Sequence, residues 1–171
     1  MIGMEEWLIV DGYNVIGVDS DGLFPVDSLE EARYTLIKML SEYQSVTGRK
    51  VIVVFDAHMV PGPGNHSIED QVMVIFTRRH ETADERIERL VSEMSSADRR
   101  IYVATSDYLE QRMIFGRGAY RISSPELIEE IKELRKQTKE KIDERQVKRI
   151  TLFHGLDEET IRRLEGIRRK K

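Results

Sequence analysis

Cysteine is absent from the 171-residue chain. This absence excludes disulfide bonds, metal sites built on thiolates and catalysis by a cysteine nucleophile. It also fits a reducing compartment, and we expect a cytoplasmic protein. Long apolar runs are missing as well, and the acids Glu5 and Glu6 lie close to the first residue. We therefore predict neither a signal peptide nor a membrane-spanning segment.

Charge is plentiful but unevenly distributed. Hydrophobic residues make up 40% of the chain and charged residues 34%, which predicts a folded core under a charged surface and not a disordered chain. The net charge is −4, but residues 1–116 hold 11 Lys and Arg against 20 Asp and Glu, whereas residues 117–171 hold 16 against 11. An acidic region followed by a basic end suits a cation site beside a polyanion track. A long helix with mixed surface charge would give the same asymmetry.

Three strand-like segments each run into an acidic residue. Residues 7–10 are apolar and stop at Asp11, residues 51–55 stop at Asp56, and residues 101–105 lead into Ser106 and Asp107. In open α/β sheets, ligands bind at the edge formed by the carboxyl ends of the parallel strands. Because carboxylates gathered at one edge repel each other, they usually share a cation or a proton. The pattern therefore predicts an acidic site at that edge.

Hydrophobic periodicity and breaker residues predict strands that alternate with helices. We predict strands at 7–10, 51–55, 72–76, 101–104 and 120–122, and helices at 28–48, 82–94, 107–115, 124–150 and 157–169. The helix from residue 124 either continues to about 150 or breaks near 138. We expect loops at 15–27 and 57–70. This alternation predicts an α/β fold, in which helices cover both faces of a parallel central sheet in three layers, with a helical C-terminal extension.

Asp11, Asp84 and Asp107 are the candidate metal ligands. Two carboxylates about 4 Å apart repel by roughly 4 kcal/mol at an effective dielectric constant near 20. A purely oxygen-donating set favours Mg²⁺ or Mn²⁺ over Zn²⁺. Such ions activate water and neutralise charge on a phosphoryl oxygen. The alternative is structural, because Asp84 and Asp107 also suit helix N-caps and Asp56, a fourth candidate, suits a loop cap.

Polar and basic residues accompany these acids. Asn14 could hydrogen-bond an acid or the scissile phosphate, although Asn is also common in turns. Ser106 could contact a phosphate or orient Asp107, or merely cap a helix. The candidate RNA-binding residues are Ser106 with Arg78, Arg79, Arg117 and Arg121. A solvated basic turn explains Arg78 and Arg79 equally well. His58 and His66 lack the spacing of metal ligands, and we expect neither to bind metal.

Several short motifs resemble the YacP-like branch of the NYN domains. Residues 10–16, Val-Asp-Gly-Tyr-Asn-Val-Ile, resemble the opening motif of this branch. Residues 54–57, 81–84 and 104–107 resemble later motifs in the right order, and residues 118–123 resemble the terminal one. The resemblance covers roughly residues 6–135. One departure is that Glu85 and Arg86 follow Asp84, where the family commonly has a small or polar residue.

The resemblance implies a PIN-like fold and metal-dependent ribonuclease chemistry with Mg²⁺ or Mn²⁺. By position, it makes Asp11, Asp84 and Asp107 metal-binding acids, Asn14 the accompanying amide, and Asp56 a further family acid. It also implies RNA as partner, with endonucleolytic cutting of messenger RNA and association with the ribosome. We expect a nuclease domain over residues 1–135 and a helical extension over 136–171 that packs on this domain or continues it.

Three functions compete at this stage. The first is a Mg²⁺- or Mn²⁺-dependent endoribonuclease, in which water attacks a backbone phosphate. The second is an RNA-binding PIN-like module without cleavage, against which the intact set of acids speaks. The third is a phospho-receiver or phosphatase-like α/β domain, suggested by Asp56 and Thr105 after strands. Two absences from the sequence speak against the third function. No lysine follows the fifth strand, and no pair of acids follows the first.

Overall fold

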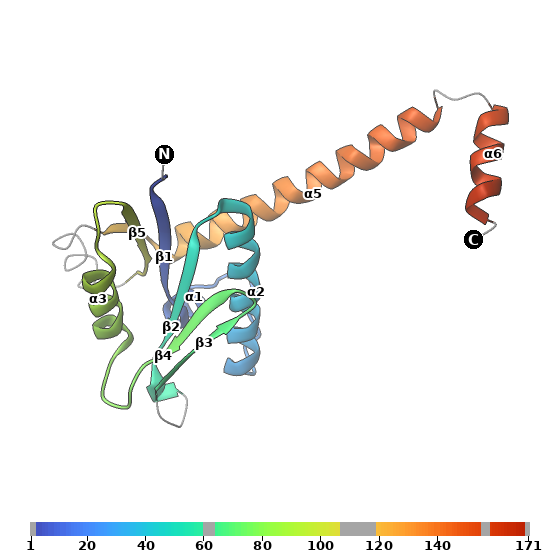
Figure 1. Cartoon of the computed structure of the whole chain (residues 1–171). Helices are drawn as coiled ribbons and strands as arrows, with labels where there is room; N and C mark the ends of the chain where they lie inside the picture. The colour runs from blue at the N-terminus through green and yellow to red at the C-terminus, as the bar shows by residue number, and fades with distance from the viewer. Residues whose placement is uncertain (1–2, 60–63, 107–118, 155–157, 170–171) are drawn as a thin grey trace. The chain divides into compact units, whose positions relative to one another are not determined.

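A computed structural model describes residues 3–59, 64–106, 119–154 and 158–169. The chain forms two compact units, residues 1–132 and residues 133–171. The first unit contains a six-stranded sheet with the order β3-β4-β2-β1-β5-β6 (Figure 1). Its strands are β1 (Glu5–Asp11), β2 (Lys50–Phe55), β3 (Asn65–Glu69), β4 (Val72–Phe76), β5 (Arg99–Ala104) and β6 (Tyr120–Ile122).

All strands except one run in the same direction. β1 pairs in parallel with β2 and β5, β2 pairs in parallel with β4, and β5 pairs in parallel with β6. Among the strands of the described residues, only β3 is antiparallel, and it pairs with β4 at the edge of the sheet. The carboxyl ends of β2, β1 and β5 therefore lie next to one another at one edge, which we call the carboxyl edge.

Helices cover both faces of the sheet (Figure 1). On one face, α3 (Ala83–Met94) buries Ile87 and Val91 against a cluster that includes Ile9 and Val54 of the sheet. The other face is covered by α2 (Leu29–Thr47), which follows the short helix α1 (Gly12–Gly17). Both faces of the central strands are apolar because both are buried, as expected for parallel sheets.

Local signals explain where the two long covering helices begin and end. The Ser28 hydroxyl accepts a hydrogen bond from the Glu31 N–H and caps α2. Gly48 ends that helix with φ of 75°, a left-handed conformation that glycine adopts without a steric penalty. The Thr82 hydroxyl accepts a hydrogen bond from the Glu85 N–H at 3.1 Å and caps α3.

A partly buried polar contact within the first unit holds the first turns of α5 (Ser124–His154) against α2. The Tyr43 hydroxyl of α2 donates to the Glu130 carboxylate at 3.3 Å and accepts from the Arg49 guanidinium at 2.6 Å. Burial raises the pKa of Tyr43 to about 12, so the phenol stays protonated and remains a donor at neutral pH. Leu127 and Ile131 of α5 are buried in the core beside this contact.

The second unit consists of the remainder of α5 and of α6 (Glu158–Arg169). Ile142, Val147 and Ile150 of α5 are at least half exposed. Among the described residues, no helix combines the length and apolar character that crossing a bilayer requires.

The predicted α/β fold with helices on both faces of a mostly parallel sheet is confirmed. Two details of the prediction were wrong. Residues 65–69 form β3, because this polar segment pairs with β4 despite its loop-like composition. Residues 15–17 belong to the helix α1 and not to a loop. Of the two alternatives for the helix from residue 124, the continuous one is confirmed, and α5 ends at His154. The helix predicted from Asp107 lies outside the described residues.

Candidate functional site

Asp11 is the last residue of β1 and lies at the carboxyl edge. Its side chain is 9% exposed and accepts a long hydrogen bond, 3.4 Å, from the Asn14 N–H at the start of α1. Strand side chains alternate between faces, so Asp11 lies on the same face as Ile9, which packs in the α3 cluster. The first strand therefore presents a nearly buried carboxylate to the side of the sheet that α3 covers.

Asp84 lies in the first turn of α3, where a negative charge is favoured by the helix dipole. The structural alternative for this residue, an N-cap, is wrong, because Thr82 is the cap. The loop from β4 to α3 leaves the sheet at the carboxyl edge, so α3 begins there. Asp84 is partly buried. Asp84 thus lies near the carboxyl edge, where β1 ends in Asp11, and on the same side of the sheet as the Asp11 side chain.

Asp56 directly follows β2, the neighbour of β1. Its carboxylate accepts a hydrogen bond from the His58 N–H at 2.9 Å, and the His58 Nδ1 lies 3.4 Å from the same oxygen. The neighbouring Ala57 N–H donates to the Thr77 hydroxyl, which fixes the ends of β2 and β4 together. Asp56 is therefore a turn residue that also lies at the acidic edge.

Asn14 connects three elements at this edge. Its Oδ1 accepts hydrogen bonds from the Ser106 N–H at 2.9 Å and from the Ser124 hydroxyl at 2.6 Å. Ser106 follows β5, and Ser124 is the first residue of α5 and is fully buried. The amide oxygen is thus committed to holding the chain just before Asp107. Only the amide NH₂ group remains for the predicted contact with an acid or a phosphate.

The predicted basic residues are spread around this edge. Arg78 and Arg79 are exposed in the loop between β4 and α3, and Arg121 is exposed on β6. The predicted residues Asp107 and Arg117 lie outside the described residues. Ser106 is partly buried, and its backbone N–H is taken by Asn14. Arg78 and Arg79 therefore lie exposed on the loop that leads to Asp84.

The described acids do not form a metal site by themselves. Within the ranges that the structure describes, no three Asp, Glu, His or Cys side chains lie close enough together to hold an ion. Asp11, Asp56 and Asp84 supply only oxygen donors, which is the donor chemistry that Mg²⁺ and Mn²⁺ prefer. The next residue in the sequence after Ser106 is Asp107, which lies outside the described residues. A cation site would therefore need Asp107 together with Asp11 and Asp84.

An aromatic and arginine cluster lies beside the acids, and sequence reasoning missed it. Tyr13, Phe55 and Phe76 form a chain of ring contacts with centroids 5.1 and 5.6 Å apart. The Arg33 guanidinium donates to the Tyr13 hydroxyl at 2.9 Å and lies 5.7 Å from the Phe76 centroid. Four residues that come from α1, α2, β2 and β4 meet here, so no local motif reveals the cluster.

Gly12 belongs to the same cluster for a steric reason. A Cβ atom at this position would lie 2.3 Å from the Phe55 ring, closer than atoms can approach. The glycine after Asp11 therefore lets the start of α1 lie directly on Phe55. This packing places Asp11 and Tyr13 together at the end of the sheet.

Comparisons with known proteins show which family the sequence matches. The family model described as the YacP-like NYN domain matches residues 8–169, so the match continues through the C-terminal helices. The chain is 46% identical over 168 residues to the YacP protein of Bacillus subtilis (strain 168), covering 95% of this chain and 96% of that protein.

The solved structures that this chain resembles are also of a YacP protein. The crystal structure of Rae1 (YacP) from Bacillus subtilis is 43% identical, with a TM-score of 0.72 over 95% of this chain and 94% of that one. A mutant form of that protein is 46% identical, with a TM-score of 0.69 over 86% of this chain and 84% of that one.

Proposed function

The chain belongs to the YacP-like NYN domain family, and we propose that it is a metal-dependent endoribonuclease that hydrolyses phosphodiester bonds in RNA. Membership of this family is consistent with an RNA-cleaving, PIN-like nuclease. The observation that carries the proposal is that Asp11, Asp56 and Asp84 belong to elements that meet at one edge of the sheet, and that Asp107 is the next residue in the sequence after Ser106. A binding module without chemistry would not need acids at this edge.

In the proposed site, Asp11, Asp84 and Asp107 hold Mg²⁺ or Mn²⁺, and Asp56 is a further candidate ligand. Such an ion lowers the pKa of water and neutralises charge on a phosphoryl oxygen. Asn14 keeps the segment before Asp107 against α1 and α5 through Ser106 and Ser124. Arg78, Arg79, Arg117 and Arg121 bind phosphates on either side of the bond that is cut.

The products and the substrate class follow by analogy with PIN-like nucleases. We expect a 5′-phosphate and a 3′-hydroxyl, because water attacks the phosphorus and the 3′ oxygen leaves. We also propose messenger RNA as the substrate, either free or bound to the ribosome, and a cytoplasmic location.

The test is cleavage of a labelled RNA by the purified protein with Mn²⁺. The wild type should cut, and EDTA should stop the reaction. Asp11→Asn and Asp84→Asn should each lower the rate at least about 100-fold, because each removes a carboxylate that would hold the ion, and the ion neutralises charge in the transition state. Asp98→Asn is the matched control, since Asp98 precedes β5 at the opposite edge of the sheet.

The same messenger RNA should be tested free and on ribosomes, and the ends of the fragments should be identified. Cleavage by wild type and by Asp11→Asn at equal rates, or no cleavage of either substrate by the wild type, would contradict the proposal. In the second case, metal-independent RNA binding that Asp84→Asn leaves unchanged would favour the RNA-binding module.

A further inference from the structure

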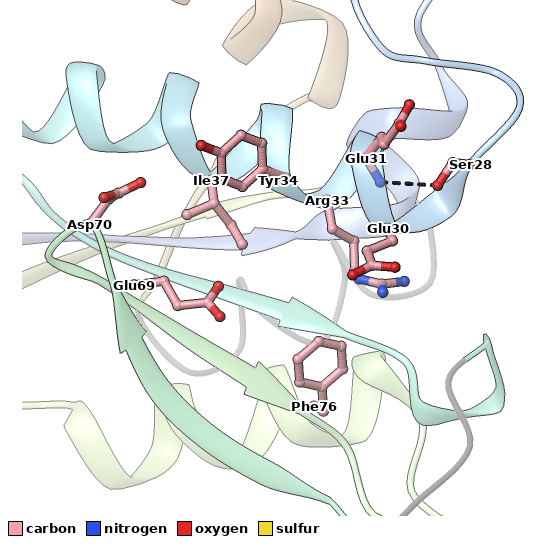
Figure 2. Close-up of a pocket in the computed structure, with 9 residues that line it drawn as sticks. All are labelled: Ser28, Glu30, Glu31, Arg33, Tyr34, Ile37, Glu69, Asp70 and Phe76. Carbon is pink, nitrogen blue, oxygen red and sulfur yellow. Dashed lines mark hydrogen bonds between the residues drawn. The ribbon is translucent and has the colours of Figure 1, made fainter.

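A groove lies between α2 and the β3–β4 hairpin of the first unit. Its volume is about 860 Å³, within the range of pockets that hold small ligands. Figure 2 shows Arg33 and Tyr34 of α2 on one wall and Phe76 on the sheet opposite. The described residues that line it are Ser28, Glu30, Glu31, Arg33, Tyr34, Ile37, Glu69, Asp70 and Phe76.

We propose, resting on the proposed ribonuclease function, that Arg33 and Tyr34 make this groove a subsite for one unstacked nucleotide of single-stranded RNA. The Arg33 guanidinium holds a backbone phosphate next to the one that is cut. The base of the same nucleotide enters the groove and stacks on Tyr34.

The position of Arg33 connects the groove with the acidic edge. Its Nη1 donates to the Tyr13 hydroxyl at 2.9 Å, and Tyr13 lies two residues after Asp11 in the same helical turn. The rings of Phe55 and Phe76 support this arrangement from below. Asp11 lies on the side of the sheet covered by α3 and Arg33 on the side covered by α2, so we infer that an RNA strand crossing the carboxyl edge from Asp11 reaches Arg33.

Arg33 forms no ion pair with an acid of the described residues, although Glu30 and Glu31 of the same helix also line the groove. Its partners among the described residues are a phenol oxygen and an aromatic ring, and no described carboxylate lies within 4.0 Å of its guanidinium nitrogens. A guanidinium carries five N–H donors, and Tyr13 accepts from one nitrogen. A partly buried cation without a counter-ion is costly unless an anion arrives. Phosphate fits the planar fork of the remaining donors.

Tyr34 supplies an exposed ring for a base. It is 57% exposed, and the Lys38 ammonium lies 4.8 Å from its centroid and steadies it. Stacking on aromatic rings is how proteins bind unpaired bases irrespective of sequence. The far end of the groove holds Glu69 and Asp70, which repel phosphates. These acids limit the groove to one nucleotide, so the RNA backbone must leave it after Arg33.

The test measures binding of a fluorescent single-stranded RNA to the full chain in EDTA, where no cleavage occurs. Arg33→Gln should bind about tenfold more weakly, as expected for loss of a charged hydrogen bond. The slope of log affinity against log salt should become shallower by about 0.7, the value for one phosphate contact on a single strand. Arg99→Gln, the same change at the opposite edge of the sheet, should leave both unchanged.

Two further variants separate the contribution of the phosphate contact to RNA affinity from that of base stacking. Arg33→Lys should keep the salt slope and recover only part of the affinity, because it keeps the charge without the fork. Tyr34→Ala should bind about fivefold more weakly with an unchanged slope. With the wild type, an abasic position scanned along the RNA should weaken binding at one place, and Tyr34→Ala should remove that effect. Thermal unfolding of each variant confirms that it is folded.

The outcomes distinguish this inference from the proposed function. If the wild type cleaves RNA while Arg33→Gln binds with unchanged affinity and slope, the subsite is overturned and the nuclease remains. If Arg33→Gln loses affinity but the wild type cleaves nothing, the subsite stands and the nuclease falls. If the wild type does not bind RNA at all, both are overturned.

Discussion

At the scale of single residues, the side-chain amide of Asn14 makes structural contacts that its place in the opening motif does not predict. The motif predicts a turn residue or a group that contacts an acid or phosphate. The structure shows that its oxygen joins the end of β5 to the start of α5 through Ser106 and Ser124. These partners are 92 and 110 residues away in the chain, so no local pattern could have identified them.

Removing this amide should therefore destabilise the fold as well as the site. Asn14→Ala leaves the buried Ser124 hydroxyl and the Ser106 N–H without their acceptor, and should lower the free energy of unfolding by about 1–3 kcal/mol. The measurement is urea unfolding followed by circular dichroism. Asn65→Ala on the exposed strand β3 should change stability by less than about 0.5 kcal/mol. Equal stability of both variants would show that the hydrogen bonds of Asn14 to Ser106 and Ser124 contribute nothing to the free energy of unfolding.

At the scale of elements, the start of α3 sets the position of Asp84. Thr82→Ala removes the cap on the Glu85 N–H and should cost about 0.5–2 kcal/mol of stability. Because Asp84 lies in the same turn, the affinity for Mn²⁺ should fall as well. Both quantities can be measured on one sample, by thermal unfolding and by calorimetry.

The cap of α2 provides the control for this prediction. Ser28→Ala removes the same kind of hydrogen bond, from Glu31 N–H, on a helix that carries none of the proposed metal ligands. It should lower stability by a similar amount and leave Mn²⁺ affinity unchanged. If Thr82→Ala also leaves Mn²⁺ affinity unchanged, the first turn of α3 does not orient a metal ligand.

Elements with strong hydrophobic periodicity could be predicted from the sequence, and those decided by distant partners could not. Residues 51–55 are apolar throughout because both faces of β2 are buried, and this run marks the strand without ambiguity. β3 has a polar, exposed sequence, and only its pairing with β4 makes it a strand. The groove lined by Arg33 and Tyr34 likewise depends on how α2 lies over the hairpin, which no motif encodes.

At the scale of the whole molecule, the acids that follow successive strands predicted one functional edge. The sheet order brings β2, β1 and β5 together, so Asp11 at the end of β1 lies between the segments that follow β2 and β5, which hold Asp56 and Ser106. Residues 117–171 carry a basic excess, with 16 Lys and Arg against 11 Asp and Glu. If this excess contributes to RNA binding, as we expect, the affinity for RNA should depend strongly on salt.

The central claim is that the acids at the carboxyl edge form one cation site, and Mn²⁺ calorimetry tests it most directly. Wild type and the control Asp98→Asn should bind Mn²⁺ with the same affinity, whereas Asp11→Asn and Asp84→Asn should each lose binding, because both carboxylates are needed to hold the ion. Equal binding by all four proteins, or no binding by the wild type, would contradict the claim.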